Sequence, residues 1–220
     1  IARACDIAEE GLLATFPRMK EGMTEREVAA VLEYEMRMRG ADGTSFETIV
    51  AFGAGSSVPH HETGDTRLKF GDVVLIDFGC KVDGYCSDCT RTFLFGDDGK
   101  HARFKECYAL VLKAHELVKQ RLVSGRTGRE ADEIARGCFR EAGLDKYFTH
   151  SLGHGIGLQI HEYPMLSPRG EEVLTDGMVF SDEPGLYFEG EFGIRIEDSV
   201  TIENDRVKSF IKTEKGLTVL

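Results

Sequence analysis

Residues 73–95 decide the fold and read Val73-Val-Leu-Ile-Asp-Phe-Gly-Cys-Lys-Val-Asp-Gly-Tyr-Cys-Ser-Asp-Cys-Thr-Arg-Thr-Phe-Leu-Phe95. The apolar run from Val73 to Phe78 predicts a buried strand, and the segment from Cys86 to Phe95 predicts a second one. Between them lies Asp83-Gly84, a dipeptide that two-residue hairpin turns prefer. The stretch therefore predicts two antiparallel neighbours in a sheet.

This hairpin brings two aspartates to one face of the sheet. Its register opposes Gly79 to Asp88. It also opposes Asp77 to Thr90, so that all four residues share a face. The two aspartates are then diagonal neighbours, about 5 to 8 Å apart at Cβ, which is close enough to hold a dinuclear metal centre. Gly79 leaves room for metal, and Thr90 can hydrogen-bond a ligand carboxylate. The alternative is a pair of solvated aspartates, but Asp77 ends an apolar run where burial without a partner is costly.

Three further candidate ligands lie downstream. His154 stands in the glycine-rich segment 151–157, which lets the backbone pass close to a metal. Glu183 ends a strand at a rigid Pro-Gly turn, which suits both metal binding and proton transfer. Glu197 alternates with Arg195 on one strand face. A set of four carboxylates and one imidazole suits two divalent cations, and therefore predicts a metal-dependent hydrolase. The candidate ligands are Asp77, Asp88, His154, Glu183 and Glu197.

Other basic side chains are candidates for contacting a substrate. His60 and His61 lie upstream of the first strand, where an imidazole could stabilise an oxyanion; the alternative is a surface loop. His150 and His161 flank the glycine segment and could serve substrate oxygens. Arg195 is either the charge partner of the neighbouring ligand glutamate or an anchor for a substrate carboxylate.

The chain contains an internal repeat. Gly22-Met-Thr-Glu-Arg-Glu27 and Gly125-Arg-Thr-Gly-Arg-Glu130 lie 103 positions apart. Each offers a Thr as N-cap with a Glu three residues later, which is the capping box of a helix start. Two pairs of strand segments are also similar in sequence at similar offsets: 71–77 resembles 177–183, and 88–93 resembles 197–202.

Each half therefore predicts helix, helix and strands, and the whole predicts one α+β domain over residues 1–220. The pseudo-repeats span about 1–103 and 104–220, and a pseudo-two-fold axis would bring their carboxylate pairs face to face. Two further helices are expected at Ile1–Phe16 and Phe104–Leu122, and further strands at Phe46–Phe52, Met178–Ser181 and Ile194–Ile202.

Composition excludes several functional classes. The net charge of −11 disfavours nucleic acid or anionic membrane as partner, and no apolar run is long enough to span a bilayer. Only Cys86-Ser-Asp-Cys89 looks like a cysteine motif, and the hairpin register puts its two thiols on opposite faces. The six cysteines therefore indicate reduced thiols and a cytoplasmic protein.

Five ordered motifs resemble the catalytic domain of the pita-bread (creatinase/aminopeptidase) metallopeptidases, and they cover essentially the whole chain. The motifs are Val74-Leu-Ile-Asp-Phe-Gly79, Ser87-Asp-Cys-Thr-Arg-Thr-Phe93, Gly153-His-Gly-Ile-Gly157, Asp182-Glu-Pro-Gly185 and Gly193-Ile-Arg-Ile-Glu-Asp198. Pro59-His60, Glu183-Pro-Gly-Leu-Tyr187 and Arg195 make the chain most similar to the Xaa-Pro peptidases, aminopeptidase P and prolidase. The resemblance implies a duplicated α+β fold with a curved, mostly antiparallel sheet.

The resemblance also implies two divalent ions (Mn²⁺, Co²⁺ or Zn²⁺) and a role for each ligand. Asp77 would hold one ion, His154 and Glu183 the other, and Asp88 and Glu197 would bridge both. A metal-bridged hydroxide would hydrolyse the Xaa-Pro bond at the N-terminus of a peptide or in a dipeptide.

The remaining roles follow from the same resemblance. His60 would lie near the scissile bond and His161 would contact the substrate carbonyl, while Glu183 would move protons. His150 and Arg195 would line the proline side. The expected partner is a small peptide, without nucleic acid or membrane.

Two departures from the family pattern stand out. Ser181 and Asp182 replace a Thr and an apolar residue, so we expect an extra charge beside the site and an effect on metal affinity. Xaa-Pro peptidases usually also carry an N-terminal domain that helps to build dimers. That domain is absent from these 220 residues, so a homodimer is expected if the full protein has it. The alternatives are a methionine aminopeptidase and a non-catalytic peptide-binding module on the same fold.

Overall fold

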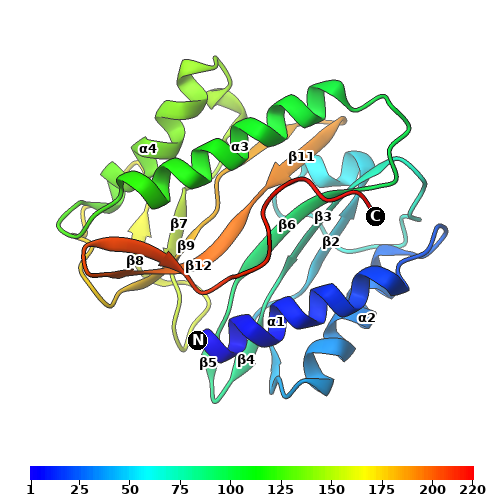
Figure 1. Ribbon diagram of the computed structural model, residues 1–220, viewed down its shortest axis with the longest axis horizontal. Helices are drawn as coiled ribbons and strands as arrows, with labels where there is room; N and C mark the ends of the chain where they lie inside the picture. Colours follow the sequence, from blue (N-terminus) through cyan, green and yellow to red (C-terminus); the bar gives the residue numbers. More distant parts are fainter.

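An antiparallel sheet of eight strands forms the centre of the protein, whose computed structural model describes residues 1–220 (Figure 1). The strands are β1 (Gly43–Thr44), β2 (Ile49–Phe52), β3 (Asp72–Phe78), β4 (Cys80–Val82), β5 (Tyr85–Cys86), β6 (Cys89–Phe95), β7 (Gly153–Gly155), β8 (Glu162–Leu166), β9 (Val179–Asp182), β10 (Gly185–Phe188), β11 (Phe192–Arg195), β12 (Glu197–Glu203) and β13 (Arg206–Ser209). The main sheet has the order β2-β3-β6-β12-β9-β7-β8, with β13 paired to β12. β1, β4 and β5 form a small second sheet, and β10 and β11 form a hairpin.

The main sheet is built from two copies of one unit. β3 and β9 contain one pair of the repeated sequence segments, and β6 and β12 contain the other pair. In the order β2-β3-β6-β12-β9-β7, the equivalent strands lie at equal distances from the boundary between β6 and β12. A pseudo-two-fold axis therefore runs between these two strands. The predicted α+β fold with duplicated halves is confirmed, whereas the limits of the repeats stay a prediction.

Helices cover one face of this sheet. They are α1 (Ala2–Thr15), α2 (Glu25–Met38), α3 (Ala102–Arg121) and α4 (Gly128–Glu141), with 3₁₀ turns η1 (Phe16–Arg18), η2 (Gly53–Ser57) and η3 (Asp145–Tyr147). α1 packs on α2 and α3 on α4, and α1 and α3 cross in front of the sheet in Figure 1. One buried cluster joins α1 and α2 to residues such as Ile76 and Phe78, and another joins α3 and α4 to residues such as Phe180 and Val200. Side chains that alternate with these, Asp77 among them, point to the opposite face.

The predicted hairpin register is present. Asp77 pairs with Thr90 and Val82 pairs with Tyr85, and both central turn positions have positive φ, 51° at Asp83 and 81° at Gly84. This is the conformation of a type I′ turn. Gly79 lies at the junction of β3 and β4, where a Cβ would come within 2.0 Å of a backbone oxygen. Only glycine therefore fits at that junction.

Three expected strands are shorter or broken. The strand expected at Phe46–Phe52 begins only at Ile49. The strand expected at Cys86–Phe95 is interrupted at Ser87 and Asp88, because the chain leaves the small sheet there and enters the main one. The strand expected at Ile194–Ile202 is interrupted at Ile196, because β11 pairs with β10 whereas β12 pairs with β6 and β9.

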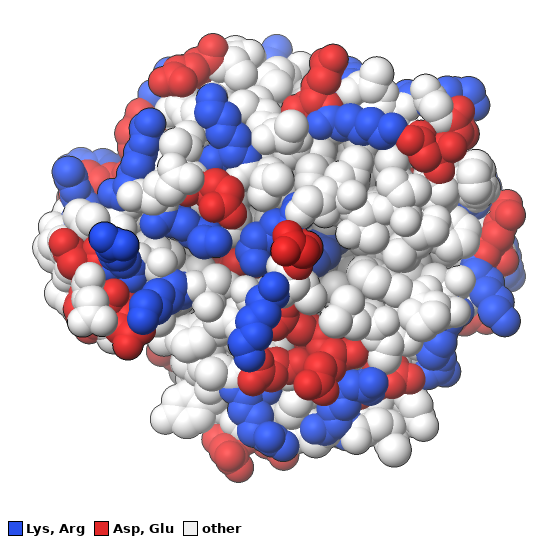
Figure 2. Space-filling model, in the orientation of Figure 1, with Lys and Arg blue, Asp and Glu red and all other residues white.

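The surface charge is mixed on the face seen in Figure 2. Acidic and basic side chains often lie next to each other there, in small groups that are separated by uncharged surface. The net charge of −11 thus forms no single field of one sign on this face. None of the helices combines the length and the apolarity needed to cross a bilayer.

Both predicted capping boxes are formed, and they support a stability test. Thr24 Oγ1 accepts a hydrogen bond from Glu27 N at 3.1 Å, and Thr127 Oγ1 accepts one from Glu130 N at 3.2 Å. Thr24→Ala and Thr127→Ala should each lower the free energy of unfolding by about 1 kcal/mol, because each leaves a helix N–H without its partner. Equilibrium urea denaturation measures the change. Thr66→Ala, at an exposed position, is the control and should shift stability by less than about 0.5 kcal/mol. Equal stability of all three variants would contradict the assignment.

Candidate metal centre

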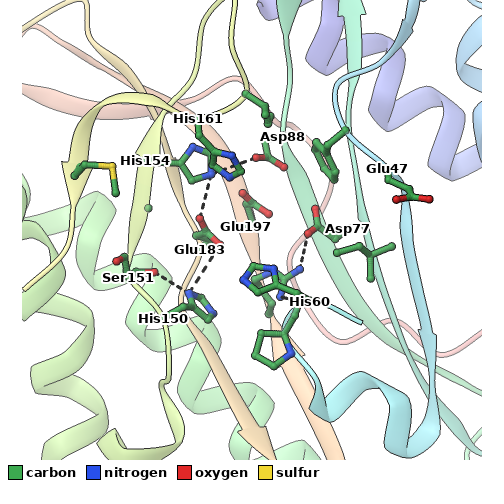
Figure 3. A pocket seen from close by; sticks show the side chains of 17 residues that line it. Glu47, His60, Asp77, Asp88, His150, Ser151, His154, His161, Glu183 and Glu197 are labelled. Atoms are coloured by element: carbon green, nitrogen blue, oxygen red, sulfur yellow. Dashed lines mark hydrogen bonds and ion pairs between the residues drawn. The ribbon is translucent and has the colours of Figure 1, made fainter. Parts of the chain in front are cut away.

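The candidate ligands meet in one cavity on the face of the sheet opposite the helices. The cavity measures about 480 Å³ and is lined by residues from both halves of the chain (Figure 3). Asp77 comes from β3, Asp88 precedes β6, His154 lies on β7, Glu183 follows β9 and Glu197 begins β12. Residues that are up to 120 positions apart in the sequence therefore converge, as the pseudo-two-fold arrangement requires.

Three of these side chains already have the spacing of a metal site. Ligand atoms of Asp88, His154 and Glu197 all lie within 4.8 Å of one another, and all three residues are buried. His154 Nε2 is 3.5 Å from Asp88 Oδ2 and 3.4 Å from Glu183 Oε1. One cation could contact several of these atoms after small side-chain shifts.

Ser181 holds two of the ligands in register. Its hydroxyl donates to Glu183 Oε1 at 3.0 Å and accepts from the backbone N–H of His154, also at 3.0 Å. Ser199, its partner across β9 and β12, donates to the carbonyl oxygen of Asp88 at 2.7 Å. Neither serine was predicted to have a role. Their spacing of two residues from Glu183 and Glu197, on the same strand face, is the signal that could have identified them.

Arg195 connects the candidate ligand Asp77 to other side chains of the cavity. Its Nη2 donates to Asp77 Oδ2 at 2.6 Å and its Nε donates to Thr90 Oγ1 at 2.9 Å. Thr90 in turn donates to Glu197 Oε2 at 2.6 Å, which is the contact that the hairpin register predicts. Arg195 thus pairs with Asp77 and not directly with Glu197. The other oxygen of Asp77, Oδ1, is buried and has no hydrogen-bond partner.

The guanidinium group of Arg195 cannot by itself compensate the negative charge of the carboxylates in the cavity. Burial and the neighbouring carboxylates raise the pKa of Asp88 and of Glu197 well above their usual range. Burial is also the main reason that the pKa of Glu183 is raised, to about 8. Burial lowers the pKa of His154 to about 4, so this ring is neutral and free to donate a lone pair. An unpartnered carboxylate oxygen, crowded carboxylates and a neutral imidazole fit divalent cations.

Arg195 and His150, which were expected to line the proline side, form a hydrogen-bonded chain with Tyr187. Arg195 Nη1 donates to Tyr187 Oη at 2.7 Å, and this hydroxyl lies 2.8 Å from His150 Nε2. His150 Nδ1 lies 2.7 Å from the carbonyl oxygen of Ser151, which can only accept, so Nδ1 carries the proton and Nε2 accepts from Tyr187. Burial lowers the pKa of His150 to about 3, consistent with this neutral ring. Tyr187 belongs to the motif Glu183-Pro-Gly-Leu-Tyr187, but no role was predicted for its hydroxyl group.

The remaining histidines divide into two groups. His60 and His161 line the cavity, and the ring of His161 stacks edge-on against His154 with centroids 4.3 Å apart. His61 does not line it: its Nε2 lies 2.9 Å from Glu25 Oε2, a buried carboxylate that also accepts from backbone N–H groups. The suggestion that His61 stabilises an oxyanion is therefore wrong. Its role is to anchor the loop to α2.

The structure places Asp182 behind the candidate ligands and not in the cavity, although its charge still helps to raise the pKa of Glu183. It does not lie beside the ligands because neighbouring residues of a strand point to opposite faces. It is fully buried between the sheet and α3, where its Oδ2 lies 3.0 Å from His115 Nδ1. Its expected effect on metal affinity stays a prediction.

A duplicated antiparallel sheet with helices on one face and a cavity of carboxylates and histidines on the other is the architecture of the pita-bread fold. The chain belongs to metallopeptidase family M24, whose family model matches residues 1–204. The predicted resemblance is thereby confirmed at the level of fold and family.

Several relatives are named for an activity on Xaa-Pro substrates. The Xaa-Pro dipeptidase of Pyrococcus furiosus is 44% identical over 217 residues, which cover 99% of this chain and 62% of that protein. An X-Pro aminopeptidase from Thermotoga maritima superposes with a TM-score of 0.96 at 41% identity, covering 100% of this chain and 62% of the other. A Xaa-Pro dipeptidase from Bacillus anthracis gives a TM-score of 0.96 at 40% identity, covering 100% and 61%. The chain thus spans about three fifths of the length of these relatives.

The metal-free protein is expected to lose stability as the pH rises from 6.5 to 8. The folded-state pKa of Glu183 is about 8, so the folded protein keeps a proton that the unfolded chain has already released above pH 5. Stability that is present at pH 6.5 is therefore lost as the pH approaches 8, by about 1 to 2 kcal/mol. Urea denaturation in the presence of a chelator measures this loss. Glu183→Gln should make the fall less steep without abolishing it, because His115, Asp88 and Glu197 also have raised pKa values. A profile that rises over this interval in the parent chain would contradict the assignment.

Proposed function

We propose that this domain is the catalytic part of a dinuclear metal-dependent exopeptidase that hydrolyses Xaa-Pro bonds, at the N-terminus of peptides or in dipeptides. The observation that carries the proposal is the convergence of five candidate ligands and Arg195 in one cavity. Relatives at 40 to 44% identity carry the names Xaa-Pro dipeptidase and X-Pro aminopeptidase, which supports the same substrate class.

Asp77, Asp88, His154, Glu183 and Glu197 would hold two divalent ions. Mn²⁺, Co²⁺ and Zn²⁺ all suit such carboxylate and imidazole donors. Bound ions supply Lewis acidity, lowering the pKa of a water molecule and polarising a carbonyl oxygen. Asp88 and Glu197 are buried and His154 is neutral, so these three donors already lie together for a cation.

Glu183 is the residue that would move protons. The raised pKa, about 8, lets its carboxyl group gain and lose a proton near neutral pH. Ser181 fixes Oε1, and Oε2 lies 4.0 Å from His150 Nδ1, so the carboxyl group has one restrained and one more mobile oxygen. Such a group can take a proton from an attacking water and pass it to the leaving imino nitrogen.

The walls of the cavity favour a proline-containing peptide. Apolar lining residues, including Ile49 and Pro59, offer a surface for a pyrrolidine ring. His60 and His161 would contact the reacting carbonyl, and Arg195 with His150 would lie on the proline side. Most donors of Arg195 are already used by Asp77, Thr90 and Tyr187, so it would mainly fix the shape of that side. A homodimer and a cytoplasmic location stay predictions.

The substrate class can be tested with purified protein. Xaa-Pro dipeptides and short Xaa-Pro peptides should be cleaved in the presence of Mn²⁺, and a chelator should abolish cleavage because the ligands no longer carry their ions. Product formation by chromatography is the measurement. Cleavage of Met-Ala peptides but not of Xaa-Pro would favour the methionine aminopeptidase alternative. Absence of metal-dependent cleavage with either substrate would favour the peptide-binding alternative.

Glu183→Gln tests the mechanism. The amide cannot carry the proton, so kcat should fall by about 10² to 10⁴-fold. Glu171→Gln, an exposed position outside the cavity, is the matched control and should keep the parental kcat. Full activity of the Glu183→Gln protein would refute the proposed role.

A further inference from the structure

A cluster of charged side chains lies directly behind the candidate metal centre. His115 projects from α3 toward the sheet and is completely buried. Asp182 on β9 and Asp198 on β12 are opposed in the sheet register, and both are also completely buried. Two carboxylates thus face each other across neighbouring strands, with one imidazole ring against them.

Both ring nitrogens of His115 face a carboxylate. Nδ1 lies 3.0 Å from Asp182 Oδ2, and Nε2 lies 3.4 Å from Asp198 Oδ2. Neither contact has the geometry of a hydrogen bond, but both nitrogens lie at ion-pair distance from a carboxylate oxygen, which favours the doubly protonated, cationic ring. The two carboxylates raise the pKa of His115 to about 9, although burial alone would lower it.

The two aspartates depend on His115 to different extents. Asp198 has other partners: Arg91 Nη2 at 2.9 Å, Ser209 Oγ at 2.6 Å and Lys215 Nζ at 3.1 Å. Asp182 has none of these, and neither of its oxygens receives a hydrogen bond. Its ion pair with His115 is therefore the one direct compensation for its buried charge. A buried carboxylate left without a partner is strongly unfavourable and drives rearrangement of the chain that carries it.

Such a rearrangement would directly displace residues of the candidate metal centre. Asp182 precedes Glu183, and Asp198 follows Glu197, so each aspartate is joined to a candidate ligand by one peptide bond. Because neighbouring residues point to opposite faces, a rotation that moves Asp182 toward solvent turns Glu183 away from the cavity. The sequence departure noted above, an Asp where an apolar residue is usual, thus has its counterpart in His115.

We propose that His115 is a positioning residue for the metal centre: its ion pairs with Asp182 and Asp198 hold β9 and β12 so that Glu183 and Glu197 point into the cavity. This inference rests on the proposed metal-binding function. It predicts that His115 sets metal affinity without contacting metal or substrate.

Metal affinity without substrate is the decisive measurement. The full chain is titrated with Mn²⁺ alone, and calorimetry measures the binding affinity. In His115→Leu the affinity for Mn²⁺ should be about 10 to 100-fold weaker, which is the range typical when a group that supports a metal ligand is lost. The double variant His115→Leu with Asp182→Leu removes the charge together with its partner and should recover the parental affinity to within threefold. Val111→Ala, a buried position on the same helix, controls for lost packing and should leave the affinity unchanged.

Each outcome is informative. Parental affinity in His115→Leu would overturn the proposal, and so would an equal loss in the single and double variants, because the stranded charge would then not be the cause. If His115→Leu does not fold, His115→Gln and its double variant with Asp182→Leu give the same comparison. The proposal would then be overturned if the double variant did not recover the parental Mn²⁺ affinity. Absence of Mn²⁺ binding by the parent chain would instead refute the proposed function itself.

Discussion

The concentration of four carboxylates around one largely desolvated cavity is the constraint on which the rest of the structure depends. Like charges repel strongly where water is excluded, so such a cluster persists only with cations or with bound protons. The protein meets part of this demand with Arg195, which pairs with Asp77. The raised pKa values of Asp88, Glu183 and Glu197 show that the demand is not met by the side chains alone. Electrostatics alone therefore favours bound cations at this cluster, or bound protons where no cation is present, independently of family membership.

Local sequence signals predicted much of the scaffold. The Asp83-Gly84 turn set the register that pairs Asp77 with Thr90, because a two-residue turn leaves no freedom in the pairing. The capping boxes at Thr24 and Thr127 located the starts of two helices, because side chain and backbone satisfy each other within four residues. These features were predictable because their partners lie close together in the sequence.

Features that depend on distant partners were not predictable from local pattern. The pairing of Arg195 with Asp77 joins residues 118 positions apart, and alternation along one strand suggested Glu197 as the partner instead. Asp182 was expected beside the site because it adjoins Glu183, although strand alternation already places it on the other face. Its partner His115 lies on a helix whose apolar periodicity gave no reason to single it out.

The position of the cavity on the pseudo-two-fold axis has a mechanical consequence. β6 and β12 are paired at Thr90 with Glu197 and at Cys89 with Asp198, so the seam between the two halves is narrow. Cations shared by Asp77 and Asp88 on one side and by His154, Glu183 and Glu197 on the other would act as a cross-link across this seam. Because the unfolded chain does not keep these ligands together, the binding free energy would add to the stability of the folded state and make the two halves unfold together.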